Sequence, residues 1–303
     1  MATASPRPNA AGSTAPAGDG DKNTAGKEMT FLEHLEELRW LLFRSACAIA
    51  VGMVLAFIYK EFFFDTILFA PRDPNFITYR ALCWLGTRSG IDGMCINEMG
   101  FSIFSGDISG QFMTHMTVAF TAGLVLAFPY VLWEIWRFIG PGLKPKEKGA
   151  VRGIIGFASF MFVLGIAFGY VVLAPLSVQF FGTYSVSDSV QRIFQLDSYI
   201  GIITSVTLWT GIVFQMPLVV IFLTRIGIAG PGFLRTYRKH GYVVVFVLAA
   251  IVTPPDVVSQ LLVGLPLILL YEISILLSAR TQRQMERKRA EEDAPPANAA
   301  KVA

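Results

Sequence analysis

The chain alternates between long apolar runs and short polar segments, and this pattern predicts helices that cross a membrane. Four runs are long enough to span the hydrocarbon core of a bilayer: residues 40–59, 112–139, 151–174 and 200–223. Two shorter apolar segments follow at 242–253 and 257–277, separated by Thr253-Pro254-Pro255-Asp256. A helix of about 14 residues is only about 21 Å long, so a shallow hairpin is expected here. The pattern predicts an all-α polytopic membrane protein with six transmembrane helices, the last two of them short.

Composition supports this class and divides the chain into three parts. The 303 residues are 53% hydrophobic and only 16% charged, with a mean hydropathy of +0.54, which argues against a soluble protein. Residues 1–27 are rich in Ala, Pro and Gly and contain no apolar core, so a disordered tail without a cleavable signal peptide is expected. Residues 28–280 form the membrane domain, including a long outer loop at 71–111, and residues 281–303 form a charged C-terminal tail.

The distribution of Lys and Arg predicts the orientation. Basic residues concentrate between the second and third runs, between the fourth and fifth, and after the sixth, whereas acidic residues dilute them on the other side. Cytoplasmic loops carry the excess of Lys and Arg, so both termini are expected in the cytoplasm of a bacterial inner-membrane protein. These basic residues are therefore interpreted as topology signals. The net charge of +3 says little about nucleic acid, and no nucleic-acid partner is expected.

The first apolar run is preceded by an unusual group of carboxylates. Thr30-Phe31-Leu32-Glu33 is a capping box, which predicts that the helix starts at Thr30. Glu33, Glu36 and Glu37 then lie on one helix face. Interaction with the helix dipole accounts for Glu33 but less well for Glu36 and Glu37, because the effect fades after the first turn. A cationic ligand is the alternative explanation.

Five motifs in order resemble the TatC family, the receptor subunit of the twin-arginine protein translocase. The match covers about residues 30–280, and the motifs are His34-Leu35-Glu36-Glu37-Leu38-Arg39; Ala70-Pro71; Phe128-Pro129 with Trp136-Arg137-Phe138-Ile139-Gly140-Pro141-Gly142-Leu143 and Glu147; Phe214-Gln215-Met216-Pro217; and Thr253-Pro254-Pro255-Asp256 with Ser259-Gln260.

The resemblance implies a receptor for signal peptides that carry paired arginines. It assigns Glu37, Arg39, Phe138 and Glu147 to the signal-peptide site, and Glu36 is a neighbour at the variable position of the motif. Two carboxylates on the same side of the membrane match the planar forks of two guanidinium groups. For Glu147 the alternative is a local ion pair with a neighbouring lysine of the same loop.

The resemblance also implies partners. The family works with TatA and TatB membrane proteins, forms homo-oligomers within the receptor complex, exports folded precursors and draws on the protonmotive force. Gln215 and Pro217 are expected to contact a partner helix in the bilayer. The alternative for Gln215 is a hydrogen bond to Thr204, Thr207 or backbone freed by Pro217.

Other residues near the membrane boundaries carry weaker expectations. Glu134 and Glu272 lie near span ends, where extension of the side chain to the interface is the simplest interpretation. The resemblance places Pro71 and Asp256 in assembly of the outer rim, although Asp256 is first expected to be a helix N-cap. Cys83 and Cys95 share the outer loop and are candidates for a disulfide or two free thiols.

Other classes of function have little support. A secondary transporter, kept as the alternative, would show internal repeats and charged groups at mid-membrane. An enzyme is also not expected. The three histidines of the chain are far apart in the sequence, and no metalloprotease or serine-hydrolase motif occurs, so we expect no cofactor and no metal site.

Overall fold

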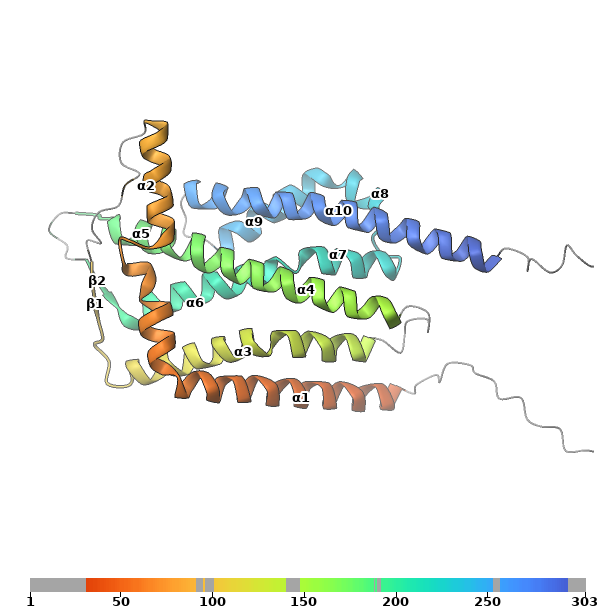
Figure 1. Cartoon of the computed structure of the whole chain (residues 1–303), viewed down its shortest axis with the longest axis horizontal. Helices are drawn as coiled ribbons and strands as arrows, with labels where there is room; N and C mark the ends of the chain where they lie inside the picture. The colour runs from red at the N-terminus through yellow and green to blue at the C-terminus, as the bar shows by residue number, and fades with distance from the viewer. Residues whose placement is uncertain are drawn as a thin grey trace, which may run out of the picture.

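The computed structural model describes residues 31–90, 95, 101–139, 148–187, 189, 192–252 and 257–293, and its long helices run side by side as a bundle (Figure 1). These helices are α1 (Phe31–Ile58), α3 (Gly110–Ile139), α4 (Lys148–Phe168), α5 (Ala174–Thr183), α6 (Leu196–Val213), α7 (Met216–Arg225), α9 (Arg238–Val252) and α10 (Val257–Asp293). A π-helical turn, η5 (Gly169–Leu173), joins α4 to α5 without a loop. The tail 1–27, Thr30, Glu147 and Asp256 lie outside the described residues.

Five stretches of the described chain are long and apolar enough to cross a membrane: Glu33–Ile58, Gly110–Ile139, Ile155–Thr183, Leu196–Arg225 and Val263–Arg287. The prediction of an all-α polytopic membrane protein is therefore confirmed. The fifth predicted segment corresponds to α9, which has 15 residues and is short as expected.

The prediction that the last helix is also short was wrong. Helix α10 has 37 residues and continues through the charged segment to Asp293. The extension is built from Arg, Gln, Glu and Ala, which favour helix, and Gln282 donates a 2.9 Å hydrogen bond to Glu286 one turn later. Hydropathy predicts only the apolar part of this helix, and the helix propensity of the polar residues extends it beyond that part.

The bundle has two distinct ends. At one, which we call the terminal end, α1 begins and α10 ends, and the short helix α8 (Pro231–Thr236) lies toward it (Figure 1). The other, which we call the capped end, carries helix α2 (Ile77–Ser89) and strands β1 (Ser102–Phe104) and β2 (Ile193–Gln195). The strands pair in parallel with Ser102 opposite Ile193, a small sheet that the apolar pattern did not predict.

Helices α1 and α3 cross at a pair of glycines. A Cβ on Gly123 would lie 2.6 Å from the backbone nitrogen of Met53, and one on Gly52 would lie 2.9 Å from the Cα of Gly123. The two backbones are thus in direct contact, as is common where membrane helices associate through small residues. Helices α4 and α6 meet in the same way, because a Cβ on Gly165 would lie 2.9 Å from the Cα of Gly211.

At the capped end, tyrosine hydroxyl groups hold irregular backbone. After α1 the chain forms a π-helical turn, η1 (Phe62–Leu68), and a 3-10 turn, η2 (Ala70–Arg72). The hydroxyl of Tyr79 lies 2.9 Å from the carbonyl oxygens of both Pro71 and Pro175, and burial raises the pKa of this phenol, so it remains a neutral donor. Buried Pro71 is therefore fixed through its carbonyl, and its side chain is covered.

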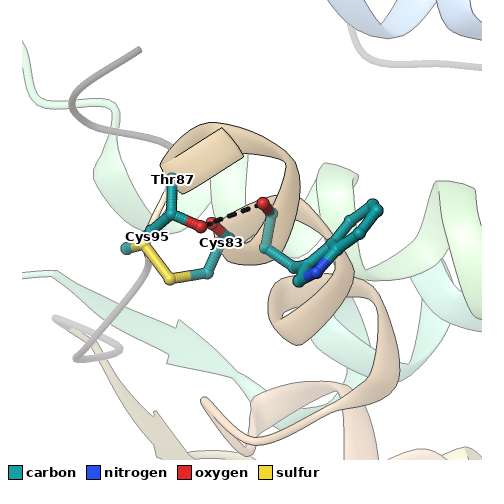
Figure 2. The surroundings of a disulfide bond; sticks show 4 residues. Cys83, Thr87 and Cys95 are labelled. Atoms are coloured by element: carbon teal, nitrogen blue, oxygen red, sulfur yellow. Dashed lines mark hydrogen bonds between the residues drawn. A yellow bond between two sulfur atoms is a disulfide. The ribbon is translucent and has the colours of Figure 1, made fainter. Parts of the chain in front are cut away.

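A disulfide joins α2 to the chain that follows it. Cys83 and Cys95 are bonded, and the Thr87 hydroxyl donates a 3.0 Å hydrogen bond to the carbonyl oxygen of Cys83 (Figure 2). Gly90 ends the helix with φ of +68°, a conformation in which an L side chain would be strained. The third cysteine, Cys47, is exposed on α1 and fills no gap in the core.

The fourth span is broken in its middle. Helix α6 stops at Val213 and α7 starts at Met216, with buried Pro217 in its first turn, where a missing N–H costs nothing. The Nε2 of Gln215 donates a 3.1 Å hydrogen bond to the Ala158 carbonyl oxygen on α4. This partner is none of the three alternatives considered from the sequence, because the side chain points across to a neighbouring helix.

Candidate functional site

The first turns of α1 present exposed charges at the terminal end. Glu36, Glu37 and Arg39 are all exposed, and no hydrogen bond or ion pair joins any of the three to another described residue. The helix places Glu37 a full turn beyond Glu33, and its carboxylate lies on the exposed surface. An exposed carboxylate without a partner can accept a bidentate hydrogen bond from a guanidinium group.

An aromatic stack fixes this end of α1 to α3. The rings of His34 and Phe138 lie 4.4 Å apart with an interplanar angle of 22°. His34 precedes Glu37 by almost one turn, and Phe138 lies in the last turn of α3. The structure therefore brings the two predicted elements together: the carboxylate-bearing turn of α1 and the aromatic residue at the end of α3.

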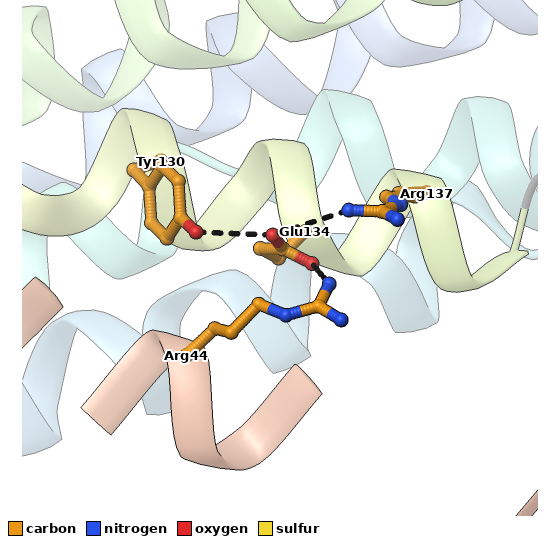
Figure 3. Close-up of polar contacts among 4 residues, drawn as sticks. All are labelled: Arg44, Tyr130, Glu134 and Arg137. Carbon is orange, nitrogen blue, oxygen red and sulfur yellow. Dashed lines mark hydrogen bonds and ion pairs between the residues drawn. The ribbon is translucent and has the colours of Figure 1, made fainter. Parts of the chain in front are cut away.

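A cluster of charged and polar side chains, which the sequence did not predict, lies between the same two helices, further along α1 from the stack. Glu134 on α3 is buried, with 3% of its side chain exposed, and Arg44 on α1 donates a 3.3 Å hydrogen bond to its Oε2 (Figure 3). Arg137 lies 3.8 Å from Oε1, and the Tyr130 hydroxyl donates to the same oxygen at 3.1 Å. The expectation that Glu134 extends to the interface was wrong, because a buried carboxylate with three polar neighbours has no need to reach water.

The cluster carries an excess of positive charge. One carboxylate faces two guanidinium groups, and the side chains of Arg44 and Arg137 are 38% and 59% exposed. Arg137 also lies over the ring of Trp133, 5.9 Å from its centroid. The carboxylate of Glu134 thus neutralises part of the positive field next to the exposed carboxylates of α1.

Glu272 on α10 keeps more contact with solvent than Glu134. Its side chain is 33% exposed, Arg238 donates a 2.8 Å hydrogen bond to Oε2, and the Tyr242 hydroxyl donates to Oε1 at 2.5 Å. The expected position near a surface fits this partial exposure, although the side chain is also paired across α9 and α10.

Sequence reasoning missed Arg44 and Tyr130. One signal was present, because Arg44 interrupts an apolar run only a few residues into the first predicted span. A charge there requires a counter-charge or a route to water. Which residue supplies the counter-charge depends on how α1 and α3 pack, and no local pattern contains that information.

The fold and the terminal end together define a polytopic helical membrane protein that presents carboxylates at one end of its bundle. The family "Sec-independent protein translocase protein (TatC)" matches residues 33–266, which is most of the chain. A Blattabacterium protein named TatC is 38% identical over 253 residues, covering 83% of this chain and 95% of that protein. A Bacillus subtilis protein named TatCy is 30% identical over 263 residues, covering 87% of this chain and 94% of its own length. The chain belongs to the TatC family and is a component of the twin-arginine translocase.

Solved structures agree. Two crystal structures described as the twin arginine translocase receptor TatC match with TM-scores of 0.60 and 0.63. Their sequence identities are 28% and 29%, and the matches cover 82% and 81% of this chain and 100% and 99% of theirs. The relatives are named as translocase components, which is a transport role, and these comparisons favour neither the solute-transporter nor the hydrolase alternative.

Proposed function

We propose that this chain is the receptor of its translocase and binds the paired arginines of signal peptides at the start of α1. The observation that carries the proposal is Glu37, an exposed carboxylate without a partner in the described chain, on a helix that two separate contacts hold against α3. Each charge-assisted contact with a guanidinium group contributes about 1.5–3 kcal/mol. Lysine keeps the charge but lacks the planar fork, so such a site prefers arginine.

Glu147, Arg39, Phe138 and Glu36 complete the proposed site. Glu147 supplies a second carboxylate from the segment that follows α3, and Phe138 contributes an apolar surface beside the arginine pair. Arg39 and Glu36 flank Glu37 on α1 and shape the local charge. The resemblance to the family assigns these roles, and the His34–Phe138 stack supports the placement of Phe138 beside α1.

The orientation and the partners belong to the same proposal. The terminal end faces the cytoplasm of a bacterial inner-membrane protein with six spans and both termini inside, as the Lys and Arg distribution favours. TatA and TatB helices dock near Gln215 and Pro217, several receptor chains assemble together, and Pro71 and Asp256 shape the outer rim. The unpaired Oε1 of Gln215 supports the partner contact, because a buried amide oxygen without a hydrogen bond can accept one from a helix that docks there.

Site-specific photocrosslinking tests the receptor role. A photoreactive side chain is placed at Leu38 or Trp40, exposed positions beside Glu37 that leave its carboxylate in place. The full chain in membranes is then offered a twin-arginine precursor or its twin-lysine version. We expect adducts with the arginine form and far fewer with the lysine form. Equal adducts with both, or none with either, would overturn the proposal.

Binding measurements provide a second readout with a matched control. Replacing Glu37 by Gln should weaken twin-arginine peptide binding by about tenfold or more, since a contact of 1.5 kcal/mol corresponds to about a factor of ten. Glu286 is an exposed carboxylate near the end of α10, where it accepts a hydrogen bond from Gln282. Glu286→Gln should leave peptide binding unchanged, and an equal loss in both variants would indicate a nonspecific charge effect.

A further inference from the structure

Helix α2 lies across the direction of the long helices at the capped end of the bundle (Figure 1). It belongs to none of the five spans, yet its two faces differ sharply. Thr78, Tyr79 and Gly86 are buried on the face that packs against the protein. Ile77, Trp84 and Leu85 are 63%, 61% and 46% exposed. The spacing of seven residues puts Ile77 and Trp84 on one side of the helix, and Leu85 lies next to Trp84 toward its edge.

The anchoring of α2 indicates its depth. The Thr78 hydroxyl donates to the carbonyl oxygen of Val171, and Tyr79 donates to that of Pro175. Both acceptors lie inside the span Ile155–Thr183, about two to three helical turns, or about 12–18 Å, before its end.

That depth places the base of α2 just inside the acyl-chain region. The span has 29 residues. Its length of about 44 Å matches the thickness of a bilayer that includes the headgroups, about 40–45 Å. Each headgroup layer takes up about 5–7 Å of that thickness, so the base of α2 lies about 5–13 Å below the boundary between headgroups and acyl chains. Interfacial helices place their apolar face at a comparable depth of about 5–10 Å.

The charges of α2 favour lipid over a polypeptide partner. The helix contains Arg80 and Arg88, both exposed, and no acidic residue. The Arg88 guanidinium lies over the ring of Trp84, 5.7 Å from its centroid. A tryptophan beside an arginine on an apolar face is typical of the membrane–water interface, where the ring sits among the headgroups and the cation meets phosphate.

We propose that α2 is an interfacial helix whose exposed face, formed by Ile77, Trp84 and Leu85, lies in the lipid leaflet at the capped end, where Arg80 and Arg88 bind anionic phospholipid headgroups. The disulfide between Cys83 and Cys95 ties this helix to the chain that follows it. The inference depends on the membrane-spanning bundle and not on the signal-peptide site.

Lipid crosslinking tests the location of the helix. The full chain, carrying a photoreactive side chain at Leu85, is reconstituted in vesicles of phosphatidylglycerol and phosphatidylethanolamine, and adducts are identified by mass spectrometry. Val54, exposed on the span of α1, is the lipid-facing reference, and Ser187, exposed beyond the end of α5, is the aqueous reference. We expect lipid adducts at Leu85 comparable with those at Val54.

Two results would overturn the location. Adducts at Leu85 as scarce as those at Ser187 would place α2 in water. In native membranes, a polypeptide adduct that replaces the lipid adducts would make the exposed face a protein interface.

A charge variant tests the headgroup preference separately. Each arginine near an anionic surface contributes about 1 kcal/mol, which corresponds to about a fivefold preference. Arg80→Gln with Arg88→Gln should therefore lower the ratio of phosphatidylglycerol to phosphatidylethanolamine adducts at Leu85 by about fivefold for each arginine removed. Arg72→Gln, in the turn before α2, is the matched control, and retention of the disulfide confirms folding. An unchanged ratio in the double variant would overturn the anionic preference.

Discussion

At the terminal end, charged side chains join α1 to α3, whereas at the capped end neutral phenols hold the chain. Arg44 pairs with buried Glu134 where α1 and α3 run together. At the other end, Tyr79 donates to the carbonyl of Pro71, Tyr170 to that of Ile67 and Tyr199 to that of Leu68. All three acceptors lie within the irregular turns η1 and η2.

The difference follows from the kind of buried hydrogen-bond acceptor that each end contains. The last carbonyl groups of η1 and η2 have no partner within their own turns, and buried carbonyls need donors. Tyrosine supplies a donor without a charge that would have to be desolvated. At the terminal end the buried acceptor is a charged side chain, and Glu134 needs a cation because a buried carboxylate alone is costly.

The largest expected effect comes from breaking the charged contact. Arg44→Ala leaves Glu134 buried with Arg137 at 3.8 Å and the Tyr130 hydroxyl as its remaining polar neighbours in the described chain. We expect a loss of about 2–3 kcal/mol in the free energy of unfolding, less than for a fully buried pair because Arg44 is 38% exposed. Reversible unfolding in mixed micelles measures it. Arg137→Ala, at the more exposed partner, should cost only about 0–1 kcal/mol, and equal losses would contradict the assignment.

A second variant tests whether close backbone packing contributes as much as the ion pair to the stability of the contact between α1 and α3. Gly123→Ala places a methyl group 2.6 Å from the backbone nitrogen of Met53, so the helices must separate. We expect a loss of about 1–3 kcal/mol. Gly156→Ala on α4 meets nothing within 4 Å and should be neutral or stabilising by up to about 1 kcal/mol. Thermal denaturation of both variants in detergent gives the comparison, and an unchanged melting temperature for Gly123→Ala would show that the crossing can open freely.

The neutral contact at the capped end should be weaker than the charged one. Tyr79→Phe removes the donor shared by Pro71 and Pro175 and leaves two buried carbonyls short of a hydrogen bond. We expect a loss of about 1–2 kcal/mol in the same unfolding assay. Tyr184 is 62% exposed and its hydroxyl has no hydrogen-bond partner among the described residues, so Tyr184→Phe should have no effect. A larger loss for Tyr79→Phe than for Arg44→Ala would reverse the ranking of the two ends.

The smallest effect on stability is expected midway between the ends. Gln215→Leu removes the hydrogen bond to Ala158, and such bonds between membrane helices average about 0.6 kcal/mol. It also removes a buried Oε1 without a partner, so the two changes nearly cancel. We expect an unchanged melting temperature together with reduced crosslinking to TatA or TatB helices. Unchanged crosslinking would show that Gln215 does not contact the partner helix. A large loss of stability would show that Gln215 mainly stabilises the fold.

The apolar pattern predicted most of the bundle because hydropathy alone fixes which segments enter a bilayer. It predicted the short helix α9 correctly for the same reason. It could not predict η1, the β1–β2 pairing or the placement of α2, because these depend on hydrogen bonds between residues distant in the chain. For the candidate site, motifs indicated Glu37 and Phe138, while the burial of Glu134 became visible only when α1 and α3 were packed together.

The Gly52–Gly123 crossing has a mechanical consequence for α1. The two backbones touch at this crossing and no side chain between them can rearrange, so the crossing is the fixed point about which α1 can tilt. Glu37 lies on an arm of about 15 residues, or about 22 Å, beyond it. Two contacts hold this part of α1 against α3: the Arg44–Glu134 ion pair and the His34–Phe138 stack. If a signal peptide binds at Glu37 as proposed, a pull on that peptide loads these two contacts first, and the first turns of α1 can move only after the contacts break.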